Sequence, residues 1–244
     1  MIPSGYKEDK VYSVKPIDGS GDLDFTRASS ATRIGSTGLI EKTRTNLLLQ
    51  SNQFDTTWTL NNASVTGGQS GYDGSSDAWL FTATSTSNCR VNQTIAGSGV
   101  QSISVYAKAN TSDFLAINAI VSGTNTIAYF DLSSGAVGTT SGAPIDADIE
   151  SVGGGWYRCS LVYNDTNTQM RFLITDGDGS SAVTNGNSIY IQDAQLEQGL
   201  VATNYIETTS SAVSVGSVDN MPRLNYTAGS TSSCPSLLLE PQRT

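Results

Sequence analysis

The chain has 244 residues, of which 14% are charged, and its 13 Lys and Arg against 22 Asp and Glu give a net charge of −9. Residues 46–209 hold four Lys or Arg against 14 Asp or Glu. This acidic part repels phosphate backbones, which excludes nucleic acid as its ligand. The chain starts without the apolar segment of an export signal, and no run of about 18 apolar residues predicts a membrane span. We therefore expect synthesis in the cytoplasm without membrane insertion.

The first 45 residues are expected to form an extended arm. Prolines and glycines interrupt residues 1–23, which carry charges of both signs and few apolar residues. Such a segment has too little apolar surface to build a core of its own. Arms of this composition can dock on another chain by adding a strand to a sheet.

A short motif occurs twice, at residues 39–45 (LIEKTRT) and 238–244 (LLEPQRT). Each copy follows a similar triplet, at residues 24–26 (DFT) and 225–227 (NYT). A period of about 200 residues is too long for a solenoid repeat and suits domains in series. The alternative is coincidence between two short polar stretches. If the repeat is real, the second copy lies where a further module would begin, or it was kept as a cap.

The middle of the chain is predicted to be all-β, an antiparallel β-sandwich of the jelly-roll type, followed by a short C-terminal β extension. Residues 101–108 alternate, with Ile103, Val105 and Ala107 on one face, and residues 156–163 alternate in the same way. Strands at intervals of about 10 to 15 residues between Gly, Ser, Asn and Asp clusters are typical of a sandwich. The further strands are expected at 77–82, 89–95, 114–121, 126–132, 145–152, 169–175 and 188–192. Helices are expected only as short connectors, near 52–56 or 193–196.

An ordered series of motifs in residues 46–209 resembles the carbohydrate-binding-module-like jelly rolls of bacteriophage virion proteins. The motifs are NLLLQSNQFD with Trp58, DAWL, SVYAKA, GGWYRC and IYIQDAQLEQG with ATNYI. The segment DLDFTRASSATR with GLIE is similar to leaders found ahead of such modules in phage tail and fibre proteins. The resemblance implies a sandwich of about ten strands and a place on a virion. It does not by itself imply sugar binding, because many sandwiches of this shape serve only as structural or contact modules. Trp58, Trp79 and Trp156 are landmarks of the resembled module, expected in its core.

From these features we expect an arm at residues 1–45, a jelly roll at 46–209, and a linker with the second motif at 210–244. By the resemblance, the arm would attach the protein to other virion proteins or to neighbouring subunits of a trimer. The protein would be a fibre-like or spike-like virion appendage that binds host surface glycans during adsorption. The alternatives are a purely structural capsid or tail decoration that binds no sugar, and a glycan-cleaving appendage.

Catalysis by this chain is not expected. The sequence has no His, which removes the most common general base, the Ser-His-Asp triad and most catalytic zinc sites. Carboxylate pairs remain, as glycosidases use, but no spacing selects a pair. We expect solvated faces for these acids: Asp131, Asp146, Asp148, Glu150, Asp193 and Glu197.

No cofactor is required, but a structural calcium is a candidate. Asp176 and Asp178 lie in a Gly-rich turn, DGDGS, whose carboxylates suit Ca²⁺, and jelly rolls of the resembled type often hold this ion. A plain Asp-Gly turn is favoured, because the rest of a twelve-residue calcium loop is absent. The three cysteines, Cys89, Cys159 and Cys234, are expected as buried thiols, with a Cys89–Cys159 bridge as the alternative.

The ligand-binding hypothesis depends on aromatic faces and planar polar groups, which recognise sugar rings and hydroxyls. Side chains that point away from the Ile and Val face of their strands are the candidates: Tyr106, Asn118, Arg171, Tyr190 and Gln192. They are expected to line one open sheet. The alternative is an ordinary polar face, with Tyr106 and Tyr190 packed under loops.

Overall fold

The computed structural model describes residues 30–34, 39–121, 125–216, 224–227 and 236–237, and the backbone of β1 (Pro3–Lys7), β2 (Lys10–Ser13) and β3 (Leu23–Asp24). Two compact units are present. Residues Thr45–Val213 form one, and Met1–Arg44 with Ser214–Thr244 form the other. Within these described residues all regular structure is β-strand, and no helix is long and apolar enough to cross a membrane.

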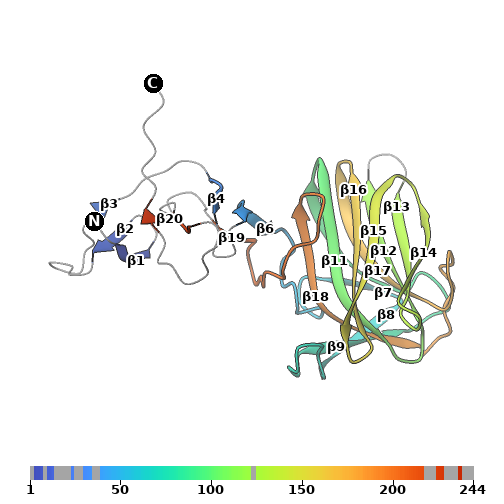
Figure 1. The fold of residues 1–244 in the computed structure, drawn as a ribbon. Coiled ribbons are helices and arrows are strands. Elements are labelled where there is room, and N and C mark those ends of the chain that lie inside the picture. Colours follow the sequence, from blue (N-terminus) through green and yellow to red (C-terminus); the bar gives the residue numbers. More distant parts are fainter. Residues whose placement is uncertain are drawn as a thin grey trace. The chain divides into compact units, whose positions relative to one another are not determined.

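The unit of residues Thr45–Val213 is a sandwich of two six-stranded antiparallel sheets (Figure 1). One sheet, here the β12 sheet, has the order β14-β13-β12-β17-β10-β7. Its strands are β7 (Thr59–Asn61), β10 (Arg90–Gly97), β12 (Phe114–Val121), β13 (Thr126–Asp131), β14 (Ala136–Ser141) and β17 (Asn167–Thr175). The other, the β11 sheet, has the order β15-β16-β11-β18-β9-β8. Its strands are β8 (Ala63–Gln69), β9 (Ala78–Ala83), β11 (Val100–Ala109), β15 (Pro144–Gly153), β16 (Trp156–Asn164) and β18 (Ser188–Gln198).

The predicted all-β sandwich is therefore confirmed, and each of the nine expected strands is present. Three strands of the sandwich were missed: β7, β8 and β14. All three lie at the edges of their sheets, where side chains pack on one side only and alternation is weak. The expected helices are wrong. Residues 52–56 form turns, and residues 193–196 continue β18.

The core lies between the sheets and takes the apolar side chains of both. Ile103, Val105 and Ala107 are buried there, as the alternation of β11 predicted. Trp58 and Trp79 are also in this core, whereas Trp156 packs in a separate cluster on the outer face of the β11 sheet. Trp156 is thus buried by packing, as expected, but outside the core between the sheets, because its position in β16 alternates with that of the core residue Cys159.

The cysteines that the structure describes are free thiols. Cys89 and Cys159 are both buried and form no disulfide, so the alternative of a bridge between them is wrong. Burial raises the pKa of the Cys159 thiol, which keeps it protonated and unreactive. Cys234 lies outside the described residues.

The second unit consists of short strand pairs. β1, β2 and β3 form a three-stranded sheet, β4 (Arg33–Ile34) pairs with β5 (Ile40–Glu41), and β20 (Leu224–Asn225) pairs with β21 (Ser236–Leu237). The backbone N–H of Ile34 donates to Asn225 Oδ1 at 3.1 Å, and the N–H of Tyr226 donates to the Ile34 carbonyl at 3.0 Å. The triplet of the second copy therefore lies beside Ile34, which falls between the triplet and the motif of the first copy. Residues 238–244, the second motif itself, fall outside the described residues. The remaining pair, β6 (Arg44–Asn46) with β19 (Val213–Val215), joins the ends of the chain that enter and leave the sandwich.

Candidate functional site

The five residues predicted to bind a ligand lie on two different sheets. Tyr106 in β11 and Tyr190 and Gln192 in β18 face outward from the β11 sheet, whereas Asn118 in β12 and Arg171 in β17 belong to the β12 sheet. The hypothesis of one open sheet is therefore wrong. Alternation shows which side chains of a strand point outward, but sheet membership depends on pairing between strands far apart in the sequence.

The aromatic residues of the β11 sheet pack together on its outer face. Tyr72, from the segment between β8 and β9, stacks on Tyr106 with a ring-centroid distance of 3.8 Å and an interplanar angle of 6°. Trp156 lies 6.4 Å from Tyr72 and 6.3 Å from Tyr190. The exposed fraction of Tyr106 is 9%, so it packs under a loop, as the alternative interpretation held. Tyr72 and Tyr190 are only partly buried.

A hollow of about 410 Å³ opens beside these rings. Its lining combines tyrosine side chains with acids and one amide: Asn52, Tyr72, Asp73, Asp77, Tyr106, Asp193, Tyr205 and Glu207. Among them only Tyr106 was a predicted ligand residue. The others come mostly from loops that meet only in the fold, and the one sequence signal for them was the cluster of acids and Gly at residues 73–77.

Gln192 holds one wall of this hollow in place. Its Oε1 accepts a hydrogen bond from the N–H of Tyr72 at 3.1 Å, and its Nε2 donates to Asp73 Oδ1 at 3.3 Å and Asp77 Oδ1 at 2.8 Å. A Cβ at Gly71 would approach Gln192 Oε1 to 2.5 Å, so a larger residue there would displace the Gln192 carboxamide. Gln192 therefore positions the loop with its carboxamide instead of presenting it to a ligand.

Asp193 forms the floor of the hollow at a β-bulge. The register of β18 against β11 shifts there, and Asp193 has a φ of 55°, which Asp tolerates better than most residues. The bulge turns the carboxyl group outward, where its Oδ2 accepts a hydrogen bond from the Tyr72 hydroxyl at 2.9 Å. Its backbone N–H donates to Asn52 Oδ1 at 3.2 Å.

The pKa values of the acids that line the hollow are shifted in opposite directions. Burial, with repulsion from Asp77, Asp73 and Glu207, raises the pKa of Asp193 to about 7, although the bond from Tyr72 opposes this. Hydrogen bonds from Ser75 lower the pKa of Asp73, so this carboxylate stays ionised. Burial raises the pKa of Tyr72 and of Tyr205, and both hydroxyls remain donors.

Several carboxylate oxygens in the hollow remain open for a ligand. Within the described residues, Asp73 Oδ2, Asp77 Oδ2 and Asp193 Oδ1 accept no hydrogen bond from the protein. Ionised carboxylates accept hydrogen bonds only, so the oxygens of Asp73 and Asp77 suit a ligand with several hydroxyl or amino donors. Tyrosine rings beside such acceptors suit a ring with an apolar face.

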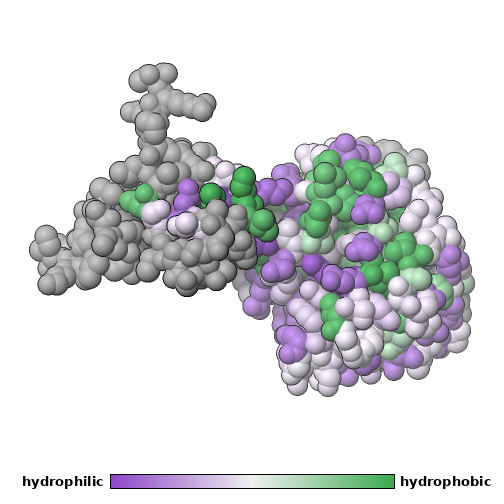
Figure 2. Space-filling view, viewed as in Figure 1, coloured by the Kyte–Doolittle hydropathy of each residue, from purple (hydrophilic) through white to green (hydrophobic). Residues whose placement is uncertain are grey.

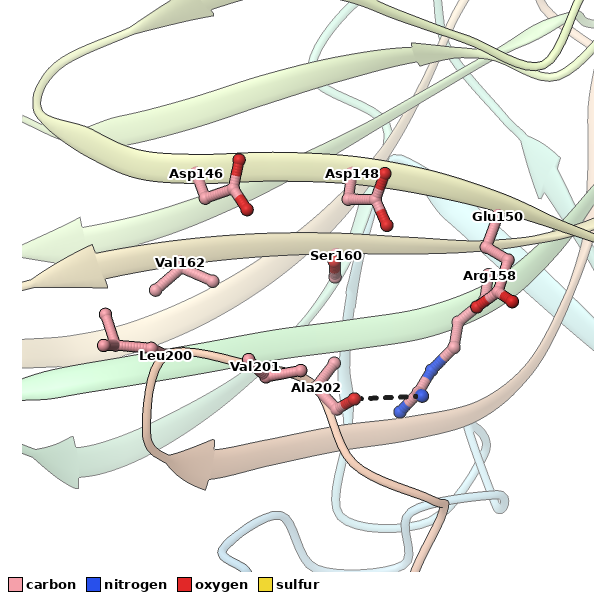
Figure 3. A pocket seen from close by; sticks show the side chains of 9 residues that line it. All are labelled: Asp146, Asp148, Glu150, Arg158, Ser160, Val162, Leu200, Val201 and Ala202. Atoms are coloured by element: carbon pink, nitrogen blue, oxygen red, sulfur yellow. Dashed lines mark hydrogen bonds between the residues drawn. The ribbon is translucent and has the colours of Figure 1, made fainter.

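A second hollow of about 150 Å³ lies on the same outer face (Figure 3). Asp146, Asp148 and Glu150 of β15 line one side, and Leu200, Val201 and Ala202 line the other. Leu200 and Val201 are exposed apolar residues, and Figure 2 shows apolar patches of this kind among the hydrophilic side chains of the sandwich.

Arg158 of β16 separates the two hollows. Its guanidinium donates to the carbonyl of Ala202 at 3.3 Å, to Ser104 Oγ at 3.2 Å and to the carbonyl of Thr203, and it lies 5.6 Å from the Tyr106 ring centroid. These bonds hold the segment after β18 on the β11 sheet. Arg158 is thus occupied by the protein, and only its Nε is buried without a partner among the described residues.

The acids predicted to hold calcium make different contacts. Asp176 accepts hydrogen bonds from Thr184 N, Asn187 Nδ2 and Ser112 Oγ, and Asp178 accepts from the N–H and hydroxyl of Thr139. Nitrogen donors aimed at both carboxylates do not fit a cation shell, which needs oxygen ligands. Within the described residues no group of three or more His, Cys, Asp or Glu could hold a metal ion, and the calcium site stays a prediction.

The sequence matches no protein-family model and no curated protein. Among solved structures, it is similar to the CBM22-1 and GH10 modules of endo-1,4-β-D-xylanase 10B from Clostridium thermocellum with xylohexaose, at 14% identity and a TM-score of 0.39, over 63% of this chain and 28% of that chain. Bacteriophage CBA120 tailspike protein 4, in its enzymatically active domain, matches at 18% identity and a TM-score of 0.37, over 62% and 21% of the two chains. TmCBM61 with β-1,4-galactotriose matches at 11% identity and a TM-score of 0.40, over 63% and 99%. The chain thus spans less than a third of the first two proteins and is similar to β-sandwich carbohydrate-binding modules and to one phage tailspike.

Proposed function

We propose that the sandwich binds a neutral or amino-bearing glycan in the hollow of about 410 Å³ on the outer face of the β11 sheet. The observation that carries the proposal is the combination of partly buried tyrosine rings with carboxylate oxygens that lack a donor among the described residues. Sugar hydroxyls supply such donors, and the apolar face of a pyranose packs on an aromatic ring. The acids of the hollow repel a carboxylated or sulfated sugar, so acidic glycans are excluded from this position.

The hollow is held ready for a ligand. Tyr72 is fixed by stacking on Tyr106 and by its bond to Asp193, and the Tyr205 hydroxyl lies 2.6 Å from Ser51 Oγ. Side chains that are already ordered lose little conformational entropy on binding, which favours affinity.

The test is a glycan array with the full chain, followed by calorimetric titration of the best neutral or amino sugar. Tyr72→Ala removes the stacking surface, and Asp77→Asn removes a charged acceptor. We expect each to weaken binding by about 10-fold or more, because hydrogen bonds to charged groups contribute about 1.5 to 3 kcal/mol. Asp113→Asn is the matched control, since Asp113 is an exposed acid outside the hollow.

Absence of binding to any neutral or amino glycan would refute the proposal and favour a purely structural role. Equal loss of affinity in Asp113→Asn would also contradict it, because the effect would then come from net charge. Thermal unfolding of each variant checks that the sandwich still folds.

Glycan cleavage is the second candidate, and one observation favours it. Asp193 has a pKa near 7 and lies close to acids that include Asp73, whose pKa is lowered. A protonated acid beside an ionised one is the arrangement of a glycosidase. Release of reducing ends from a bound polysaccharide, lost in Asp193→Asn, would establish cleavage, and binding without release would leave the first proposal.

We also propose a virion appendage as the setting of this binding, with residues 1–45 attaching it to other virion proteins or to a homotrimer. The support is the sequence resemblance of the leader and of the module. Mass spectrometry of purified particles made with and without residues 1–23 tests the role of this arm. Particles that keep the shortened protein at full occupancy would refute it.

A further inference from the structure

The outer face of the β12 sheet carries a polar row that none of the contacts described so far explains. Asn92 of β10, Arg171 of β17 and Asn118 of β12 are register partners on three neighbouring strands. Partners in register point to the same side of a sheet, with Cβ atoms about 5 Å apart. Since Val91, Phe172 and Ile117, the next register row, are in the core, this polar row faces outward.

Both asparagines of the row are buried but incompletely bonded. Asn92 has 2% and Asn118 has 9% of its area exposed, and the Oδ1 atom of each has no donor among the described residues. A buried carbonyl oxygen without a donor costs about 1 to 3 kcal/mol, so two such atoms beside one arginine need an explanation. A ligand that donates hydrogen bonds to them would supply it, once each amide group turns so that its buried oxygen faces the ligand.

The two arginines of this face also have few partners among the described residues. Arg171 donates from Nε to Gln169 Oε1 at 2.5 Å, and Arg90, two residues before Asn92, has a buried Nε without a partner in the described part of the chain. No carboxylate within the described residues forms an ion pair with either guanidinium. Burial, together with repulsion from Arg90, lowers the pKa of Arg171. Two of the four cations in this acidic module are therefore neighbours and lack an anion.

Apolar residues flank the row and complete a surface for a ring. The next row that faces outward, two positions along each strand from the polar row, runs from Arg90 through Leu173 and Ala116 to Tyr129. Leu173, Ala116 and Tyr129 form a small apolar cluster separate from the core. The face thus offers guanidinium donors, amide groups and an apolar strip on two neighbouring outward rows of one sheet.

We propose that this face binds an acidic glycan, whose carboxylate pairs with Arg171 and Arg90 and whose hydroxyls donate to Asn92 and Asn118. A free inorganic anion satisfies only the guanidinium groups, and a neutral sugar satisfies only the amides. A uronic acid residue satisfies both, because it carries a planar carboxylate that suits bidentate pairing with arginine and several hydroxyl donors. The site is distinct from the acidic hollow of the β11 sheet, which repels the same ligand.

The test is calorimetric titration of the full chain with an oligogalacturonate at low salt. Arg171→Gln is expected to weaken binding by about 10-fold to 100-fold. Asn118→Asp places a carboxylate beside Arg171 at almost unchanged size, so it is expected to abolish binding through pairing within the protein and repulsion of the ligand. Lys108→Gln removes one positive charge from the opposite sheet and is expected to change affinity by less than about twofold.

Three results would overturn the proposal: no binding of the oligogalacturonate, unchanged binding in Arg171→Gln, or an equal loss in Lys108→Gln. Polyglutamate is the competitor that separates acidic sugar from acidic peptide, and equal affinity for it would exclude the glycan assignment. Tyr72→Ala, which alters only the other face, is expected to leave oligogalacturonate binding intact, so failure of the neutral-glycan proposal and failure of this one are distinguishable. Circular dichroism of each variant confirms folding.

Discussion

The two outer faces of the sandwich use arginine in opposite ways. On the β11 sheet, Arg158 donates to two backbone carbonyls and a serine, and its surroundings are acidic. On the β12 sheet, Arg171 has one partner and Arg90 has none among the described residues. A side chain that the protein itself occupies contributes stability, whereas one that it leaves open is available for a ligand. The same residue type therefore serves structure on one face and, in our proposal, recognition on the other.

The largest expected effect concerns Asp193, the buried acid of the β11 sheet. Its pKa is raised to about 7 in the folded chain, against about 3.9 when unfolded. Stability from this group is complete below pH 4 and is lost as pH rises to 7, by about 4 kcal/mol at about 1.4 kcal/mol per pKa unit. Asp193→Asn keeps an acceptor for Tyr72, and Asn tolerates the positive φ. We therefore expect the variant to have a higher unfolding midpoint than the wild type at pH 8 and the same midpoint at pH 4.

Urea unfolding at several pH values measures this difference. The acids whose pKa is lowered, such as Asp131, act in the opposite direction and lose their stabilising effect below pH 4, so the interval from pH 4 to 7 isolates Asp193. A wild-type stability that stays flat across this interval would contradict the assignment.

The next effect concerns Arg158. Arg158→Gln removes the bonds to Ala202, Thr203 and Ser104 and the contact with Tyr106, and it leaves the part-buried carbonyl of Ala202 without this donor. We expect a loss of about 2 to 4 kcal/mol in unfolding free energy. Hydrogen exchange should show the segment after β18 opening first. Lys108→Gln, on the same face but without such bonds, is the control, and an equal loss there would refute the role of Arg158.

A smaller effect is expected from Tyr205→Phe. The hydroxyl lies 2.6 Å from Ser51 Oγ, and Ser51 Oγ also accepts from the N–H of Thr208 at 2.9 Å. Loss of one neutral hydrogen bond should lower the unfolding free energy by about 1 kcal/mol. Tyr157→Phe is the control, since no hydrogen bond of its hydroxyl is part of this network. A loss of unfolding free energy larger than that of Arg158→Gln would contradict the assignment of a single neutral hydrogen bond to this hydroxyl.

The sequence predicted the sandwich because its central strands alternate clearly. In β11, Ile103 and Tyr106 were assigned correctly to opposite faces, since period two determines the face directly. It could not predict that Asn118 and Tyr106 lie on different sheets, because the order of strands depends on long-range pairing. The hollow was missed for the same reason. Tyr72 and Asp193 are 121 residues apart, and the bulge that turns Asp193 outward has no signal in the alternation of β18.

The smallest expected effect gives the sharpest contrast between the faces. Arg90→Gln removes a guanidinium that makes no bond with any described residue, so no hydrogen bond within the described part of the chain is lost. It also removes the repulsion that Arg90 exerts on Arg171. We therefore expect a change in unfolding free energy within about 0.5 kcal/mol, in either direction. The comparison with Arg158→Gln, measured in the same urea series, shows whether the two arginines differ in their contribution to stability. If Arg90→Gln destabilises the sandwich as strongly as Arg158→Gln, then Arg90 serves the fold, and the polar row of the β12 sheet is not held open for a ligand.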